Sequence, residues 1–321
     1  MPVLIKEMDL AREMLKEGRG LSFFRTKGAL AMLKKAVLAS AIATLLGAPA
    51  SVLAQSTAPA ASDHTLTGNL AIVTDYRFRG ISQTFGGSNF WAPAVQGGID
   101  YSHSSGFYVG NWNSNVSGTQ YPNGSSIEMD FYGGWKGTWD DFGLDVGTLY
   151  YYYPNTAKFI GTTPGGQNYS TTINNWEVYV GGSWKFLSVK YFYSFTDYFG
   201  LSDPVAANYF NQDGTQTLQT ASGKTGNTKG TQYLTAALTY EIMPKLNLIA
   251  SAGYTWLGNY GGQLDYFDYK IGATYDWNGW VFGLAGVGTD ADKQWWYAVN
   301  GEGKVRDLGK FNAVLSVSKT F

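Results

Sequence analysis

The chain has 321 residues, in which 23 Lys and Arg nearly balance 24 Asp and Glu. It contains no Cys, which excludes a disulfide scaffold, a cysteine zinc site, a thiol enzyme and a Cys-anchored lipoprotein. The balanced charge argues against a nucleic-acid binder, which needs a basic face, and the aromatic content of 16% argues against disorder. Few charges (15%) together with 41 Gly and many aromatic residues indicate β-structure that meets a membrane interface.

A targeting segment is predicted near the start of the chain. Met32-Leu33-Lys34-Lys35 is basic, and the apolar run that follows at 36–48 is shorter than the roughly 20 residues of a membrane-spanning helix. Val52-Leu53-Ala54 then has the small-residue pattern of a cleavage site. We therefore expect a secretory signal peptide over 32–54.

Residues 1–31 precede this signal and do not fit in front of it. We expect them to be an upstream extension that comes from a misassigned start, with Met32 as the true first residue. The alternative is a short amphipathic helix over 5–16. A short segment at 55–65 then leads into the mature fold at 66–321.

Apolar and polar residues alternate along most of the mature chain, which is the pattern of strands and not of helices. Ile127, Met129 and Phe131, for example, alternate with Glu128 and Asp130. No later stretch approaches the 18 consecutive apolar residues of a spanning helix. We predict twelve strands, at 66–80, 93–102, 107–117, 126–138, 142–153, 172–185, 188–199, 231–242, 246–258, 266–277, 280–290 and 310–321.

The connections between these strands alternate between long and tight. An even number of strands with its loops sorted in this way is typical of an outer-membrane barrel, with long loops outside and turns in the periplasm. A soluble sandwich with Greek-key links has no reason to sort its loops. The tight connections are Ser104-Ser105-Gly106, Asp140-Asp141, Phe186-Leu187, Met243-Pro244-Lys245 and Asn278-Gly279, and the long ones are 81–92, 118–125, 154–171, 200–230, 259–265 and 291–309.

Aromatic residues and the chain end agree with a barrel. A last strand that alternates and ends on Phe321 is similar to the assembly signal of outer-membrane proteins, although Lys319 departs from the usual apolar residue. Aromatic residues gather near the predicted strand ends, where membrane girdles lie, at 150–153, 191–193, Tyr254 with Trp256, and Tyr275 with Trp277.

Several stretches carry a family resemblance: LAIVTDYRFRGISQ at 70–83, VQGGIDY at 95–101, SGFYVGNWNSN at 105–115, EMDFYGG at 128–134 and KYFYS at 190–194. On these stretches the chain resembles the TorF-type porins over its mature length, and most closely over 70–135, although 85–91 lengthens the first loop relative to that family. The resemblance implies a porin architecture and no catalytic residues, and it supplies no substrate.

Extending the strand alternation inward places nine acids and six bases in the lumen, which is therefore mildly acidic. These charges either hold water and bias solutes by charge, or pair across the barrel and satisfy one another. Twelve strands lie between filled barrels of about eight and open channels of 16–18, so the pattern leaves open whether the lumen conducts. The predicted pore-lining residues are Asp75, Arg77, Arg79, Asp100, Glu128, Asp130, Lys136, Asp145, Glu177, Lys190, Glu241, Asp268 and Lys270, with Lys185 and Asp276 at the same parity.

Catalytic and metal sites are not expected. His64 precedes the first predicted strand and His103 lies in a predicted periplasmic turn, so neither joins a Ser–His pair in one barrel site. Glu128 and Asp130 could form an acid/base pair, but such pairs in barrels usually line the lumen. Asp290-Ala291-Asp292 is too short for a calcium site, and no glycine-rich segment opens a helix as a phosphate loop must.

The sequence thus predicts an all-β protein, an antiparallel up-and-down transmembrane β-barrel of about twelve strands. The predicted function is a porin-like channel for passive diffusion of small hydrophilic solutes across the outer membrane of a Gram-negative bacterium. The expected partners are outer-membrane lipid and, through the strand that ends at Phe321, the barrel assembly machinery; no cofactor, metal or nucleic acid is expected. The alternatives are a non-conducting barrel whose outer loops bind a partner, and an outer-membrane enzyme.

Overall fold

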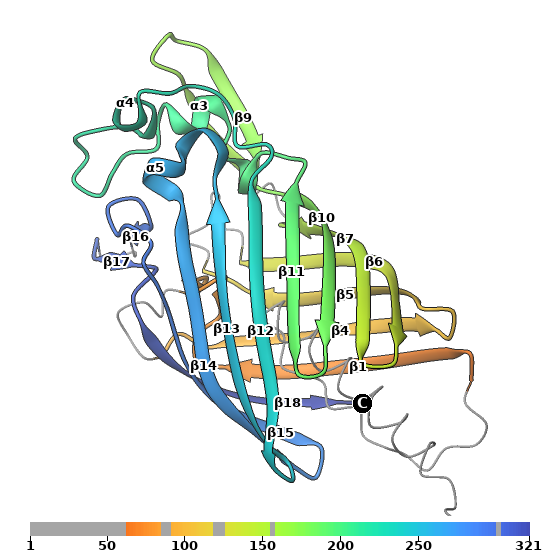
Figure 1. Cartoon of the computed structure of the whole chain (residues 1–321). Coiled ribbons are helices and arrows are strands. Elements are labelled where there is room, and N and C mark those ends of the chain that lie inside the picture. Colours follow the sequence, from red (N-terminus) through yellow and green to blue (C-terminus); the bar gives the residue numbers. More distant parts are fainter. Residues whose placement is uncertain (1–61, 85–90, 118–125, 155–157, 300–302) are drawn as a thin grey trace, which may run out of the picture. The chain divides into compact units, whose positions relative to one another are not determined.

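The computed structural model describes residues 62–84, 91–117, 126–154, 158–299 and 303–321 (Figure 1). The predicted signal peptide at 32–54 and the predicted extension at 1–31 lie outside the described residues, as do residues 85–90 of the first long loop.

Twelve antiparallel strands form a closed barrel, which is completed where β18 pairs with β1 (Figure 1). The predicted up-and-down barrel is therefore confirmed. The barrel strands are β1 (His64–Val73), β4 (Ala94–His103), β5 (Phe107–Asn115), β6 (Ile127–Trp139), β7 (Phe142–Tyr152), β10 (Asn175–Trp184), β11 (Leu187–Ser194), β12 (Gln232–Met243), β13 (Leu246–Trp256), β14 (Tyr266–Trp277), β15 (Trp280–Thr289) and β18 (Asn312–Thr320).

The first strand is shorter than predicted. The barrel strand ends at Val73, seven residues before the predicted end of the strand at 66–80, so that prediction is wrong in its last part. Beyond it Arg79 has φ 46° and Gly80 has φ 79°, both in the left-handed region that ends a strand. The short antiparallel pair β2 (Arg77–Phe78) and β3 (Ile81–Ser82) forms around this turn.

Side chains alternate across the barrel wall, as the sequence pattern predicts. On β6, Phe131 is 45% exposed and faces outward, whereas Glu128 and Asp130 are buried inside. Ile72 and Ile271 are likewise exposed on the outer face of other strands. An apolar surface of this extent is unfavourable in water and favourable against lipid.

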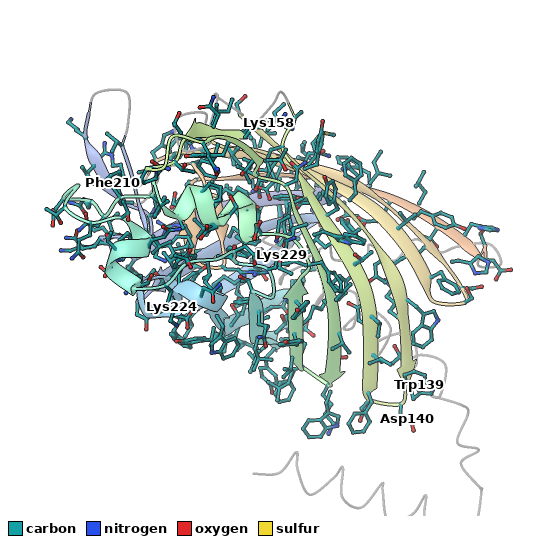
Figure 2. All side chains as sticks on the ribbon, turned by 90° about the horizontal axis from the view of Figure 1, so that it is seen from above. Trp139, Asp140, Lys158, Phe210, Lys224 and Lys229 are labelled. Carbon is teal, nitrogen blue, oxygen red and sulfur yellow. The ribbon has the colours of Figure 1, made fainter. Side chains whose placement is uncertain are left out.

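Exposed aromatic side chains lie near both ends of the strands. Three residues of the predicted clusters, Tyr151, Tyr153 and Phe192, instead face inward and are buried, because strand alternation turns every second residue toward the lumen. Figure 2 shows Trp139 and Asp140 at the turn end, away from Lys158 and Phe210 in the loops. The exposed rings near the turns include Phe107, Trp139, Phe142, Trp184, Trp277 and Trp280, and those near the loops include Trp91, Tyr150, Tyr152, Trp176, Tyr193 and Trp256.

Tight turns join the strands at one end of the barrel. Asp140, Lys185 and Asn278 have φ values of 51°, 53° and 53°, the positive values that two-residue hairpins use. The turns predicted at 104–106, 140–141 and 278–279 are confirmed by the strand bounds. The turn predicted at 186–187 lies one residue earlier, because β11 begins at Leu187.

Long loops join the strands at the other end, as predicted, and they contain short elements that the sequence did not reveal. These loops also share a hydrophobic cluster that includes Tyr198, Leu218, Tyr260 and Trp295. Among the described residues, no helix is long and apolar enough to cross a membrane. The loop elements are β8 (Lys158–Thr162), β9 (Asn168–Thr172), η2 (Tyr198–Gly200), α3 (Asp203–Ala206), α4 (Leu218–Ser222), η3 (Gly258–Tyr260), α5 (Gly261–Leu264), β16 (Tyr297–Val299) and β17 (Val305–Asp307), several of which are labelled in Figure 1.

Candidate functional site

Residues 74–84 fold into the barrel, and we call them the inward-folded segment. They are organised around Asp75, whose side chain is fully buried. Arg77 Nε donates to Asp75 Oδ2 at 2.6 Å, and Ser82 Oγ donates to Asp75 Oδ1 at 2.7 Å. Asn312 on β18 donates to the same carboxylate at 3.0 Å. The Asp75 carboxylate thus links residues within the inward-folded segment to one another, and it also links the segment to β18, the last strand of the barrel.

Arg77 fixes the other side of this segment. Its Nη1 donates to the backbone oxygens of Gly80, Leu308 and Lys310 at 3.0, 3.2 and 2.9 Å. Both Asp75 and Arg77 therefore lie in the inward-folded segment and not on a strand of the barrel, which corrects their predicted position on the barrel wall.

Arg79 connects the inward-folded segment to the barrel wall. Its Nη2 donates to Glu177 Oε2 on β10 at 2.6 Å, with both side chains buried. Its guanidinium also lies 4.2 Å from the ring centre of Tyr233 and 5.3 Å from that of Phe192. Cation–π contacts of this kind strengthen when water is excluded, so the ion pair and the rings together hold the segment inside the barrel.

A third buried ion pair joins β11 to β7 across the intervening strand β10. Lys190 Nζ on β11 donates to Asp145 Oδ2 on β7 at 2.7 Å, and Tyr108 Oη donates to Asp145 Oδ1 at 2.6 Å. Tyr108 also shares a short hydrogen bond with Tyr179. Six of the predicted lumen charges are therefore paired, as the second of the two sequence interpretations expects.

Glu128 and Asp130 lie next to each other on the inner face of β6, and both are buried. Glu128 Oε1 accepts a hydrogen bond from Tyr76 Oη at 2.9 Å. Asp130 Oδ1 has no hydrogen-bond partner among the described residues. Neither carboxyl forms an ion pair within the described part of the chain.

The other predicted lumen residues fall into two groups. The first group lies inside the barrel. Asp268 is buried and accepts a hydrogen bond from Tyr233, and the half-buried Asp100 accepts one from Tyr132. Lys136 is half-buried and lies over the Tyr108 ring. Lys270 is half-buried and lines a lumen cavity of about 110 Å³. By contrast Glu241 and Lys185 are exposed at the turn end, and Asp276 accepts from the turn residue Gly279.

Buried polar atoms without a protein partner recur inside the barrel. Buried polar groups in proteins are almost always hydrogen-bonded, to water when no protein group is near. Within the described residues the atoms without a partner include Arg77 Nη2, Gln96 Oε1, Trp112 Nε1, Asp130 Oδ1, Ser188 Oγ and Asp268 Oδ2.

Tyrosines are the lumen residues that the sequence interpretation missed. Tyr76, Tyr108, Tyr132 and Tyr233 each donate to a carboxylate inside the barrel. A signal was present, since Tyr132 has the same strand parity as Glu128 and Asp130. Inner glycines give two of these rings room, because a Cβ at Gly110 would collide with the ring of Tyr132 and one at Gly253 with that of Tyr233.

Both histidines lie together at the turn end. His64 is the first residue of β1 and pairs with His103 of β4, with ring centres 5.1 Å apart. The expectation that His64 precedes the strand is therefore wrong. A Ser–His contact also exists, since His103 Nδ1 lies 2.6 Å from Ser105 Oγ, but it is local to the β4–β5 turn and outside the lumen.

A closed antiparallel barrel with an apolar outer face and a charged interior defines a transmembrane β-barrel protein. The chain belongs to the Gcw_chp family, which is described as a bacterial protein of unknown function, and the family model matches residues 57–321. The resemblance to TorF-type porins is not confirmed by this match.

Solved porin structures are similar to the chain. The NanC porin is 12% identical and covers 80% of this chain and 99% of its own, with a TM-score of 0.45. A KdgM porin in complex with disordered oligogalacturonate is 10% identical over 80% of this chain and 99% of its own (TM-score 0.43), and OmpT of Vibrio cholerae is 10% identical over 82% and 99% (TM-score 0.36). No curated protein matches the chain.

Proposed function

We propose that this protein is an outer-membrane channel of a Gram-negative bacterium, through which small hydrophilic solutes diffuse passively. The observation that carries the proposal is the set of buried polar atoms inside the closed barrel that have no partner among the described residues, because they need water or a solute for their hydrogen bonds. The apolar outer face and its aromatic residues support insertion in a membrane. By the general topology of such barrels, the long loops face outside and the tight turns face the periplasm.

The inward-folded segment 74–84 sets the width of the proposed path. It is held by Arg77 and Arg79 and occupies part of the lumen on the loop side. Solutes then pass between this segment and the part of the barrel wall that lines the lumen cavity beside Lys270. The path is narrow and polar, which favours small hydrophilic solutes over large or apolar ones.

Recordings in planar lipid bilayers test the proposal directly. The purified, folded barrel is expected to produce discrete current steps in potassium chloride, and the detergent buffer alone is the control. A barrel that is heat-modifiable, and hence folded, but gives no steps would contradict the channel.

A second candidate is a non-conducting barrel whose outer loops bind a partner. It is favoured by the hydrophobic cluster that the outer loops share, since most loops are polar and do not pack a core of their own. A silent bilayer recording, together with binding of a ligand to the loops, would favour this candidate over the channel.

The C-terminal residue supports a proposed contact with the barrel assembly machinery. Phe321 N donates to Gly68 O at 2.8 Å, while the Phe321 side chain is 70% exposed and available to a partner. Deleting Phe321 should lower the amount of heat-modifiable barrel in the membrane and leave unfolded protein in the periplasm. Phe321→Ala keeps the backbone bonds and removes the ring, so equal assembly of Phe321→Ala and wild type would reject recognition of the ring.

A further inference from the structure

The outer loops enclose a cavity of about 390 Å³ that is separate from the lumen cavity beside Lys270. We call it the outer pocket. Its walls come from the inward-folded segment, from the start of β14 and from described residues of three long loops, within 158–174, 195–231, 290–299 and 303–311. The aromatic side chains that line it include Phe78, Phe159, Tyr198, Tyr266, Trp296 and Tyr297.

The outer pocket is held in shape by contacts among its own side chains. Phe199 lies edge-on to Phe78 and to Tyr198, with ring centres 5.5 and 4.7 Å apart. Tyr266 and Trp296 form a similar pair at 5.0 Å. A pocket whose rings are fixed before binding loses little entropy when a ligand enters, which favours affinity.

The polar groups of the outer pocket are mostly used within the protein. Tyr297 Oη donates to the backbone oxygen of Phe210 at 3.1 Å, and Trp296 Nε1 donates to that of Leu264 at 3.3 Å. The described lining contains no charged side chain. A sugar or an ion would therefore lose its hydration in the outer pocket without replacement, whereas an apolar ring would gain from burial.

One hydroxyl remains able to bond to a ligand. Tyr198 Oη accepts a weak hydrogen bond from Arg79 Nη1 at 3.4 Å, and its own proton meets no acceptor among the described residues. Burial raises the pKa of Tyr198 to about 12, so the hydroxyl stays protonated and can donate.

We propose that the outer pocket binds a small neutral aromatic compound of one or two rings that carries a hydrogen-bond acceptor, which Tyr198 recognises. The volume agrees, because a dry apolar cavity of about 150 Å³ holds one benzene ring and the outer pocket is more than twice that size. The proposed ligand differs in class from the hydrophilic solutes of the channel. Its binding does not depend on whether the lumen conducts.

Equilibrium dialysis of 2-naphthol against the full-length barrel in nanodiscs tests this inference, with empty nanodiscs to subtract partition into lipid. Saturable binding of 2-naphthol is expected, and sucrose and 2-naphthalenesulfonate should not bind. Phe159→Ala and Tyr297→Ala should each weaken binding about tenfold, because each removes a wall of the outer pocket. Tyr198→Phe should weaken the binding of 2-naphthol but leave the binding of naphthalene unchanged.

Phe210→Ala is the matched control. Phe210 lies in the same loops and is 46% exposed, but it does not line the outer pocket, so its loss should leave the dissociation constant unchanged. Heat-modifiability shows whether each variant is folded. Equal binding of 2-naphthol to folded Phe159→Ala, Tyr297→Ala and wild type would overturn the inference, as would sucrose binding as tightly as 2-naphthol. Bilayer currents are not read here, so failure of this test leaves the channel proposal standing.

Discussion

Replacing Arg79 by Ala is expected to loosen the inward-folded segment and to raise the single-channel conductance. The substitution removes the 2.6 Å ion pair to Glu177 and the contacts to the surrounding rings. Glu177 is then left buried without a cationic partner, which costs about 3–5 kcal/mol in the free energy of unfolding. Bilayer recordings measure the conductance, and urea titration in lipid vesicles measures the stability.

Two variants distinguish the effect of losing the ion pair from the effect of moving the inward-folded segment. In Arg79→Ala/Glu177→Gln the unpaired carboxylate of Glu177 is also removed. The stability should therefore largely return, while the larger conductance persists. Arg79→Lys keeps the charge but loses the planar fork and should lie between wild type and Arg79→Ala. Unchanged conductance in a folded Arg79→Ala barrel would show that the segment does not narrow the path.

The strands of the barrel could be predicted because each is a local pattern. Alternation along β6, for instance, is decided by residues 127–139 themselves, and the bilayer makes the outer face uniformly apolar. The tight turns were equally local: Asn278-Gly279 suits a two-residue hairpin by its own chemistry. Errors at these turns amount to one residue, as at Lys185.

The inward-folded segment could not be predicted in this way, because its pattern imitates a strand. Asp75, Arg77 and Arg79 continue the alternation of β1 without a break. What takes the chain off the wall is bonding to distant partners, such as Asn312 and Glu177. Gly80 was the one local sign, since a glycine inside a strand pattern often marks a turn or bulge.

The sequence also could not predict which of the lumen charges pair with one another. Asp145 and Lys190 meet because β7, β10 and β11 are adjacent and in a fixed register. Their charges alone fit equally well with a water-facing lining. The short loop elements, such as α4 with its Thr217 cap, were missed because four or five residues carry too little periodicity to detect.

Glu128 and Asp130 should make the channel prefer cations. They are the buried acids of the lumen wall on β6, and neither is neutralised by an ion pair within the described residues. Arg77 and Arg79, by contrast, are neutralised by Asp75 and Glu177 and should contribute little to ion selectivity. The selectivity of the path is therefore expected to depend on the two unpaired carboxyls.

Glu128→Gln/Asp130→Asn should lower the potassium-over-chloride permeability ratio about fivefold, which corresponds to about 1 kcal/mol of lost attraction. Reversal potentials under a potassium chloride gradient measure this ratio. The effect should be largest well below 0.1 M salt, because the Debye length then exceeds about 10 Å and the carboxylates are less screened. Glu241→Gln is the matched control, because Glu241 is exposed at the turn end and surrounded by solvent. Its ratio should stay close to that of wild type. If the folded double variant keeps the wild-type ratio at low salt, the two carboxyls are either uncharged or away from the path, and they do not select the solute.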